Sequence, residues 1–354
     1  MIFEKTGHGG DIYSRQVWHD FSANINPLGT PESVRRAVID SANRIHQYPD
    51  PCCRELIGKI AEYEGVSPNY VMCGNGAAEL IFSFCAAARP ERALELAPTF
   101  SEYTAALEAV GCQVERYQLK KENHFTLTDA FISVLQETTW DAVFLCNPNN
   151  PTGRLIPPVL LEKICRICEE RKIRLFLDEC FLDLSDGGGT HSMKRYLERF
   201  PKLFLLKAFT KNYGMAGLRL GYCLSSDRGL LERMSKITQV WNVSIPAQAA
   251  GIAALEEAEF LARAKAIITE ERLRLGKELE RLGFAVCPSH ANYILFYSPK
   301  NIEDALLNNG ILIRNCANYH GLERGWYRIA VKRKEENDLL IFALRQVMGG
   351  LNRG

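Results

Sequence analysis

The chain has 354 residues, enough for one large domain and a smaller one. Hydrophobic residues make up 47% and charged residues 24% of the sequence, and the formal net charge is +1. These values are typical of a globular enzyme and argue against nucleic acid or an acidic membrane surface as a partner. No apolar run has the length of a membrane span and residues 1–8 lack the apolar core of a signal peptide, so we expect a cytoplasmic protein.

Residues 1–30 are predicted to form an N-terminal arm rich in Gly, His, Asn and Pro. A helix is expected from Pro31, with Thr30 as its N-cap, and it should end near Tyr48, before two prolines that a helix cannot accommodate. A second helix is expected over residues 53–64. Two helices should therefore separate the arm from the first strand.

From residue 70 onwards, short apolar runs alternate with helical segments, which predicts a largely parallel sheet covered by helices on both faces. We assign this part to a large domain over residues 31–245. The expected strands cover residues 70–73, 93–97, 142–146, 174–177 and 203–206, with a further strand from about Arg219.

The last third of the chain has a different pattern. Residues 246–282 are predicted to form a long helix with a break, and three strand-like runs follow at 293–297, 311–314 and 327–331. A final amphipathic helix comes after them. A long helix, then strands, then a helix is typical of a separate α+β domain, here residues 246–354.

Twelve cysteines raise the question of disulfides or a metal site. They are scattered through apolar runs, where a free thiol packs as a small hydrophobe. In the one Cys-x-x-Cys pair, Cys165 and Cys168 share a face of a predicted helix with Leu161 and Ile164. Since no second Cys/His pair lies nearby at ligand spacing, we expect reduced, buried thiols and no metal site.

One lysine follows directly after a buried strand, within residues 203–222. A desolvated ammonium needs a partner or loses its proton, so Lys211 is a candidate nucleophile that forms a Schiff base. Arg219, eight residues further on, could hold a phosphate with its forked guanidinium. Taken alone, the Thr210-Lys211 pair is better explained by a surface lysine that follows a strand.

Small residues follow the first predicted strand, at the edge where α/β sheets bind ligands. Gly76, Ala77 and Ala78 open a helix whose free N–H groups and dipole favour an anion such as phosphate. An ordinary strand-to-helix turn has the same pattern, so this signal is weak by itself.

Three further residues fit one cofactor. An asparagine before a proline in residues 147–153 could hydrogen-bond a phenolate oxygen, and Asp178, at a strand end, could pair with a protonated ring nitrogen. Phe100 could stack on a ring. A tight turn, a helix cap and core packing are their respective alternatives. With Lys211 and an anion site, however, they meet the requirements of pyridoxal 5′-phosphate, which we therefore predict as the cofactor.

The motifs in residues 147–153 and 216–222, with Asp178 and Lys211, resemble class I/II aminotransferases of fold type I. The resemblance covers nearly the whole chain. It implies an α/β fold in which a mostly parallel seven-stranded sheet lies between helices, together with a smaller α+β domain. It also implies that pyridoxal 5′-phosphate is the cofactor and that the enzyme is a homodimer with a shared active site.

The resemblance also implies roles for individual residues. Lys211 would bond the cofactor and transfer protons, Arg328 would bind the substrate carboxylate, and Tyr48 would reach the cofactor phosphate of the second subunit. Arg314 and the arm would surround the substrate phosphate. The implied cofactor contacts are Tyr48, Gly76, Ala77, Ala78, Phe100, Asn150, Asp178, Phe181, Thr210, Lys211 and Arg219, and the implied substrate contacts are His8, Gly9, Asn24, Asn150, Arg314 and Arg328.

The branch of the family that the chain resembles includes threonine-phosphate decarboxylases and histidinol-phosphate aminotransferases. Residues 8–10 with 20–29, 311–319 and 327–331 favour the decarboxylases. The implied reaction is conversion of L-threonine O-3-phosphate to (R)-1-aminopropan-2-yl phosphate in cobalamin synthesis. A histidinol-phosphate aminotransferase using 2-oxoglutarate and a non-catalytic, cofactor-binding regulatory domain are the alternatives. Two residues depart from the family pattern: Ala208 replaces the usual Ser, which implies weaker cofactor binding, and Lys207 replaces the common Arg.

Overall fold

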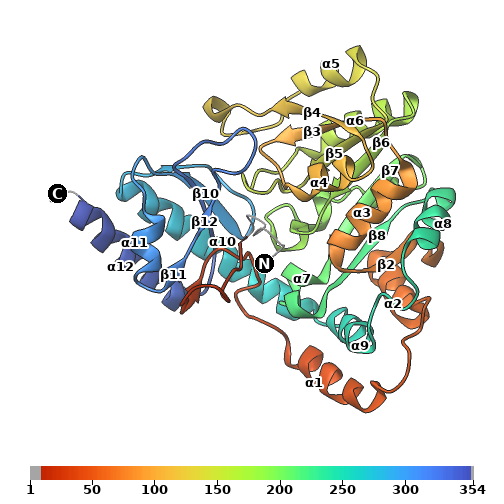
Figure 1. Ribbon diagram of the computed structural model, residues 1–354, viewed down its shortest axis with the longest axis horizontal. Helices are drawn as coiled ribbons and strands as arrows, with labels where there is room; N and C mark the ends of the chain where they lie inside the picture. The colour runs from red at the N-terminus through yellow and green to blue at the C-terminus, as the bar shows by residue number, and fades with distance from the viewer. Residues whose placement is uncertain (1–8, 352–354) are drawn as a thin grey trace.

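The computed structural model describes residues 9–351. Its main feature is a seven-stranded sheet in which β8 is antiparallel to both neighbours and all other neighbouring strands are parallel (Figure 1). The predicted α/β fold class is thereby confirmed. In spatial order the strands are β2 (Val71–Asn75), β8 (Leu220–Leu224), β7 (Leu203–Ala208), β6 (Arg174–Asp178), β5 (Ala142–Cys146), β3 (Arg92–Ala97) and β4 (Gln113–Gln118).

Alternation along the central strands divides the interior between the two faces of the sheet. Phe144, Phe176 and Phe204 point to one face, where neighbouring rings stack at 4.7 and 5.0 Å under Phe84. Most leucines of the same strands point to the other face: Leu145, Leu175, Leu177, Leu203 and Leu205. The first face carries α3 (Gly76–Ala88), α4 (Glu102–Glu108) and α8 (Arg228–Ile237), and the second carries α2 (Arg54–Glu64), α5 (Ala130–Glu137) and α6 (Pro158–Glu170).

The buried thiols predicted on α6 are confirmed. Cys165 and Cys168 are 2% and 1% exposed and belong to the same core as Leu161 and Ile164. Burial in apolar surroundings raises the pKa of Cys165 to about 12, so this thiol stays protonated. The helical spacing that placed these residues on one face was therefore a correct guide to packing.

The helix after the arm differs from the prediction at both ends. α1 (Glu32–Ser41) has Pro31 at its N-cap, because the hydroxyl of Thr30 instead donates to the carbonyl of Gly214 at 2.8 Å. The helix ends at Ser41, well before Tyr48. Every side chain from 42 to 48 is exposed, Ile45 and Tyr48 included, so the last predicted turns bury no apolar face within the chain that would stabilise a longer helix.

One strand of the sheet was not predicted. β4 lies at the sheet edge, and its Glu115 and Arg116 interrupt the apolar pattern that marked the other strands. Arg116 forms an ion pair with Glu95 on β3 at 2.9 Å. An edge strand with alternating charges is half solvated, so hydrophobicity alone cannot identify it.

The C-terminal part contains a four-stranded antiparallel sheet, in the order β12 (Arg314–Asn315), β13 (Trp326–Ala330), β10 (Tyr293–Tyr297), β9 (Ala285–Val286). The expected strand over 311–314 is two short strands, β11 (Ile311–Leu312) and β12, which join different sheets. β11 pairs in parallel with β1 (His19–Asp20) of the arm. The arm is therefore built into the C-terminal part of the fold.

The break in the long predicted helix is confirmed, since α9 (Ile245–Ala254) ends before α10 (Ala258–Arg281) begins. α9 packs against α1 and α2 of the large part, whereas α10 contributes Leu275 and Leu279 to the core of the small one. We therefore propose that the boundary between the two domains lies after α9, rather than at residues 245/246.

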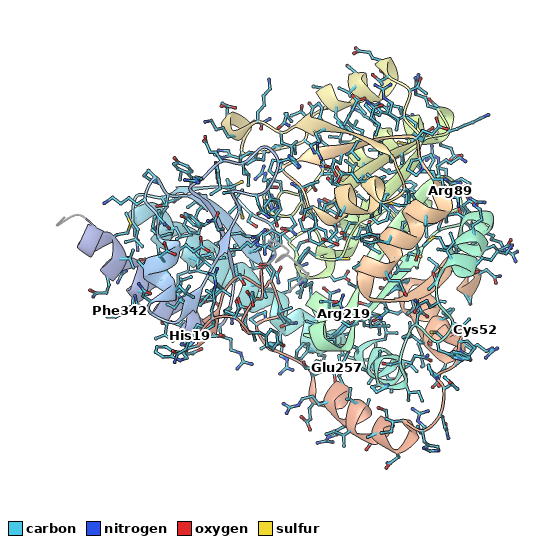
Figure 2. All side chains as sticks on the ribbon, in the orientation of Figure 1. His19, Cys52, Arg89, Arg219, Glu257 and Phe342 are labelled. Atoms are coloured by element: carbon cyan, nitrogen blue, oxygen red, sulfur yellow. The ribbon has the colours of Figure 1, made fainter. Side chains whose placement is uncertain are left out.

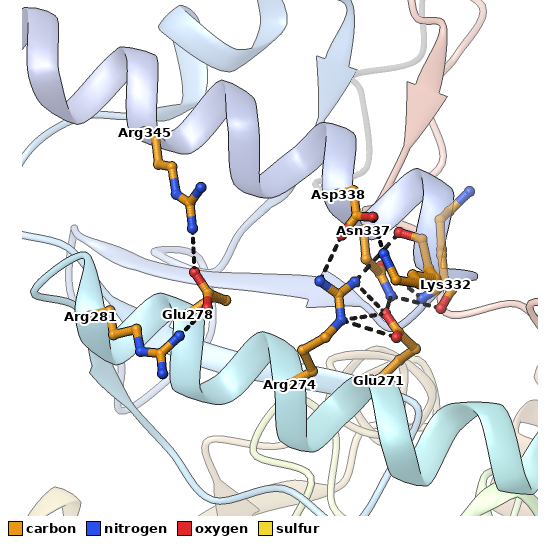
Figure 3. Close-up of polar contacts among 9 residues, drawn as sticks. Glu271, Arg274, Glu278, Arg281, Lys332, Asn337, Asp338 and Arg345 are labelled. Carbon is orange, nitrogen blue, oxygen red and sulfur yellow. Dashed lines mark hydrogen bonds and ion pairs between the residues drawn. The ribbon is translucent and has the colours of Figure 1, made fainter.

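Ion pairs join α10 to the final helix, α12 (Lys334–Leu351) (Figure 3). Arg274 bonds both Glu271 and Asp338 at 2.6 Å, and Glu278 accepts from Arg345 at 2.7 Å. Asn337 donates to Glu271 at 2.7 Å. These contacts fix the register of the two helices that cover the four-stranded sheet. No helix within residues 9–351 has the length and apolar character of a membrane span.

Candidate active site

A cavity of about 250 Å³ lies at the carboxyl ends of the parallel strands, where it also meets the arm and the small sheet. Most of the predicted site residues line it. They are Gly9, Asn24, Ala77, Ala78, Phe100, Asn150, Asp178, Phe181, Thr210, Lys211, Arg219, Arg314 and Arg328.

Lys211 lies on α7 (Phe209–Asn212), the single turn that follows β7. Its side chain is surrounded by protein, although part of its surface faces the cavity. Burial lowers the pKa of Lys211 to about 8, and the positive charges of Arg328 and Arg219 add to this effect. A neutral amine near physiological pH is the form that attacks a carbonyl group.

The reactivity of Lys211 toward an aldehyde should follow this pKa. We expect the rate of imine formation with a small aldehyde to rise about tenfold per pH unit up to about pH 8 and then level off, since the neutral fraction saturates there. Borohydride trapping followed by mass spectrometry of the Lys211 peptide measures the rate. A rate that keeps rising to about pH 10, where ordinary lysines titrate, would contradict the prediction.

Asp178 ends β6 and presents a fixed carboxylate at the cavity. The hydroxyl of Tyr103 donates to its Oδ2 at 2.5 Å, and the backbone N–H of Cys180 donates to its Oδ1 at 2.8 Å. Burial raises the pKa of Asp178, and these hydrogen bonds act in the opposite direction. Tyr103, which is fully buried, was not predicted, because a contact behind the cavity wall leaves no motif in the sequence.

One end of the cavity suits an anion. Ala77 and Ala78 lie in the first turn of α3, where backbone N–H groups are free of helical partners. Arg219 reaches the same place, near the centre of the molecule (Figure 2). Gly76 does not line the cavity, but it permits this approach, since a Cβ there would lie 2.6 Å from Nη2 of Arg219. Its φ of +79° also favours glycine.

The opposite end of the cavity holds two guanidinium groups. Arg314 on β12 and Arg328 on β13 are directly opposite each other in the antiparallel pair and are 8% and 6% exposed. Arg328 donates to Oδ1 of Asn150 and to the carbonyl of Ser22, and Arg314 donates to Asn318 at 2.8 Å. Like charges in this position repel each other, so the strand register creates a strongly positive site for anionic ligand groups.

The arm closes one side of the cavity. Gly9 packs so closely that a Cβ there would lie 2.6 Å from the carbonyl oxygen of Ser22. Ser22 Oγ accepts from the N–H of Gly10 at 2.7 Å, and Asn292 donates to the carbonyl of Asn24 at 3.1 Å. The predicted residue His8 lies outside the described residues.

Tyr48 is a second predicted site residue, after Gly76, that does not line the cavity. It is 76% exposed and stacks on Trp241 with 4.3 Å between ring centroids. Its predicted contact with the cofactor of a second subunit therefore stays a prediction.

Several lining residues were not predicted as site residues. Ile81 follows Ala77 by four positions on α3, so helical spacing could have found it. Cys146 ends β5 and Cys180 follows Asp178 by two positions. The full set of additional residues is Ser22, Ala23, Ile81, Cys146, Cys180, Ala208 and Tyr319.

A buried ion-pair network lies on the other side of β7 from Ala208. The ammonium of Lys207 is 3.0 Å from Glu64 and 3.6 Å from Asp183. Against the effect of burial, the surrounding carboxylates raise the pKa of Lys207. Asp183 also accepts from Asn212 at 2.8 Å, and Asn212 adjoins Lys211. The network therefore holds the turn that carries the candidate nucleophile.

Replacing Lys207 by methionine should destabilise the fold by about 3–5 kcal/mol, because Glu64 and Asp183 lose a buried cation. Denaturant unfolding measures the change. Lys194, 31% exposed and 2.8 Å from Glu64, is the matched control, and Lys194→Met should cost only about 1 kcal/mol. Lys207→Arg should keep most of the stability. Equal losses for Lys207→Met and Lys194→Met would refute the role of the buried pair.

Comparison with known proteins gives a family match and a relative that both cover most of the chain. The family profile described as "Aminotransferase class I and II" matches residues 17–344. Threonine-phosphate decarboxylase from Salmonella typhimurium is 36% identical over 99% of this chain and 99% of its own length.

Solved structures show the same fold. Histidinol-phosphate aminotransferase from Clostridium acetobutylicum matches with a TM-score of 0.87 and 29% identity, covering 94% of this chain and 99% of that one. The histidinol-phosphate aminotransferase from Sinorhizobium meliloti, in complex with pyridoxal-5′-phosphate, matches with a TM-score of 0.82 and 24% identity over 96% of this chain and 93% of its own. The latter likeness supports the fold.

Proposed function

The chain belongs to the class I and II aminotransferase family, whose enzymes depend on pyridoxal 5′-phosphate, and from this premise we propose that it decarboxylates L-threonine O-3-phosphate. The product would be (R)-1-aminopropan-2-yl phosphate. The 36% identity to a threonine-phosphate decarboxylase, over nearly the full length of both chains, supports this choice.

The cavity fits the cofactor on its own geometry. When bound, pyridoxal 5′-phosphate supplies an electron sink for the bond that breaks at Cα of the substrate. Asp178, fixed by two donors, would hold the ring nitrogen, and Phe100 would cover the ring. The first turn of α3 and Arg219, brought together by Gly76, would hold the phosphate. Lys211 would anchor the aldehyde carbon and return a proton to Cα.

The observation that carries the choice of substrate is the opposed pair of Arg314 and Arg328. Two buried cations on neighbouring strands require two anionic groups, and L-threonine O-3-phosphate offers a carboxylate and a phosphate. We propose that Arg328 binds the carboxylate and that Arg314 with the arm binds the phosphate. Two fixed anchors would determine which bond at Cα stands perpendicular to the cofactor ring, and hence which bond breaks.

A histidinol-phosphate aminotransferase is the second candidate, and the TM-score of 0.87 to the enzyme from Clostridium acetobutylicum favours it. Histidinol phosphate carries a phosphate but no carboxylate, so it would leave one of the two guanidinium groups without an anion. A dicarboxylic keto acid could occupy both in the second half-reaction. The two candidate functions therefore differ in whether the amino substrate carries a carboxylate that Arg328 could bind.

The test uses the purified, cofactor-loaded enzyme and L-threonine O-3-phosphate as the only substrate. Steady release of CO2 with formation of aminopropanol phosphate, in the absence of any keto acid, is the expected result. Absence of CO2 together with conversion of the cofactor to its amine form by histidinol phosphate would overturn the decarboxylase assignment. The control variant is Lys236→Ala, a change at an exposed lysine on α8. It should release CO2 at the wild-type rate.

We further propose that the enzyme is a homodimer and that it works in the cytoplasm on a pathway to cobalamin. Tyr48 and Trp241 are exposed and stacked. Ile45, three positions before Tyr48, and Val240, adjacent to Trp241, are also exposed. An exposed apolar surface of this kind is typical of a subunit interface. Sedimentation of the wild-type chain should give twice the monomer mass, and a monomeric wild-type enzyme with full activity would refute the shared site.

A further inference from the structure

Tyr319 lines the cavity together with the two guanidinium groups of Arg314 and Arg328 and with Asn150. The ring is 6% exposed, and the guanidinium carbon of Arg314 lies 5.3 Å from its centroid. Its hydroxyl lies 3.5 Å from Oδ1 of Asn150, the atom that also accepts from Arg328. The phenol thus fills space directly beside the proposed carboxylate site.

The loop that carries Tyr319 is held on both sides. Within the loop, the N–H of Tyr319 donates to the carbonyl of Cys316 at 3.0 Å, and the N–H of Leu322 donates to the carbonyl of Tyr319 at 3.1 Å. Gly321 has a φ of +83°, and a Cβ there would lie 3.1 Å from the backbone of Ala97 at the end of β3. The loop is therefore pressed against the large sheet, which keeps the phenol in place.

We propose that Tyr319 is a specificity-determining residue that limits the substituent beside the proposed carboxylate site to the size of a carboxylate. L-Threonine O-3-phosphate and histidinol phosphate both carry a phosphate two bonds beyond Cα. They differ in the other substituent of Cα, which is a compact carboxylate in one and an imidazolylmethyl group in the other. We expect the ring of Tyr319 to leave room for the first and to obstruct the second. This inference rests on the proposed function, because it assumes that Arg328 receives the carboxylate.

The test compares dissociation constants of the two ligands for the holoenzyme, measured from the change in cofactor absorbance on rapid mixing, before the proposed reaction consumes L-threonine O-3-phosphate. Tyr319→Ala should shift the ratio of the two constants at least about tenfold in favour of histidinol phosphate. Tyr319→Phe keeps the ring and should leave the ratio unchanged. If Tyr319 had a purely structural role, its replacement would weaken the binding of both ligands equally. The ratio of the two dissociation constants would then be the same in every variant.

The matched control is Tyr297→Ala, which removes an aromatic ring that packs on Trp326 of the same sheet and lies outside the cavity. Its ratio should equal that of the wild type. If Tyr319→Ala fails to bind cofactor, Tyr319→Leu keeps an apolar side chain and should shift the ratio in the same direction. An unchanged ratio in the cofactor-binding variant, or wild-type binding of histidinol phosphate as tight as that of threonine phosphate, would overturn the proposal. Failure of CO2 release is a separate result that concerns the reaction alone.

Discussion

Replacing Lys211 by alanine is expected to reduce turnover by at least about four orders of magnitude. The change removes the amine that we propose bonds the cofactor and moves the proton at Cα. The variant should still bind pyridoxal 5′-phosphate weakly, since Arg219, the first turn of α3 and Asp178 are intact. Rapid quantification of product from the wild-type and variant enzymes, both saturated with cofactor, measures the loss.

The control for this prediction is Lys236→Ala, which removes an exposed lysine of α8 and should leave turnover unchanged. Unfolding temperatures of the variants show whether either change damages the fold. Turnover by Lys211→Ala within tenfold of the wild type would contradict both the assignment of the lysine and the proposed reaction.

Replacing Asp178 by asparagine should have the second largest effect. The variant keeps the shape of the side chain but loses the negative charge that would stabilise a protonated ring nitrogen. Removing one member of a buried charge pair costs about 3–5 kcal/mol, which corresponds to roughly 10²–10⁴-fold in kcat/KM. Steady-state kinetics and the absorbance spectrum of the bound cofactor measure the effect.

Tyr103→Phe is the matched comparison, because it removes one hydrogen bond to Asp178 and retains the charge. The loss of a single hydrogen bond to a charged group costs about 1.5–3 kcal/mol, or roughly ten- to 150-fold. If Tyr103→Phe were as damaging as Asp178→Asn, the hydrogen-bonded geometry rather than the charge would be the important property.

Much of the fold could be predicted because the central strands are buried on both faces. β5, for example, is an unbroken apolar run, and its predicted bounds are those observed. β4 could not be found in this way, since it lies at an edge where charged side chains are stabilised by solvent and by ion pairs. Hydrophobic pattern thus reports burial rather than strand formation itself.

The residues of the candidate site also divide into those that the sequence predicts and those that depend on the three-dimensional fold. Lys211, Asp178 and Arg219 were predicted from several motifs taken together and from the resemblance, and all three line the cavity. The opposition of Arg314 and Arg328 depends on the register of two strands, and the contact of Tyr103 with Asp178 depends on how α4 packs behind β6. Neither register nor packing behind a wall can be deduced from spacing in one sequence.

The parallel pairing of β1 with β11 has a consequence for the order in which the molecule is made. During synthesis the arm is made long before its hydrogen-bond partners Leu312 and Ala330, which lie far along the chain. The large sheet can fold as it emerges, whereas the arm can pair only after β11 has been made. A nascent chain therefore carries Lys211 and Asp178 without the wall that closes over them, and the candidate active site is completed only after the large sheet.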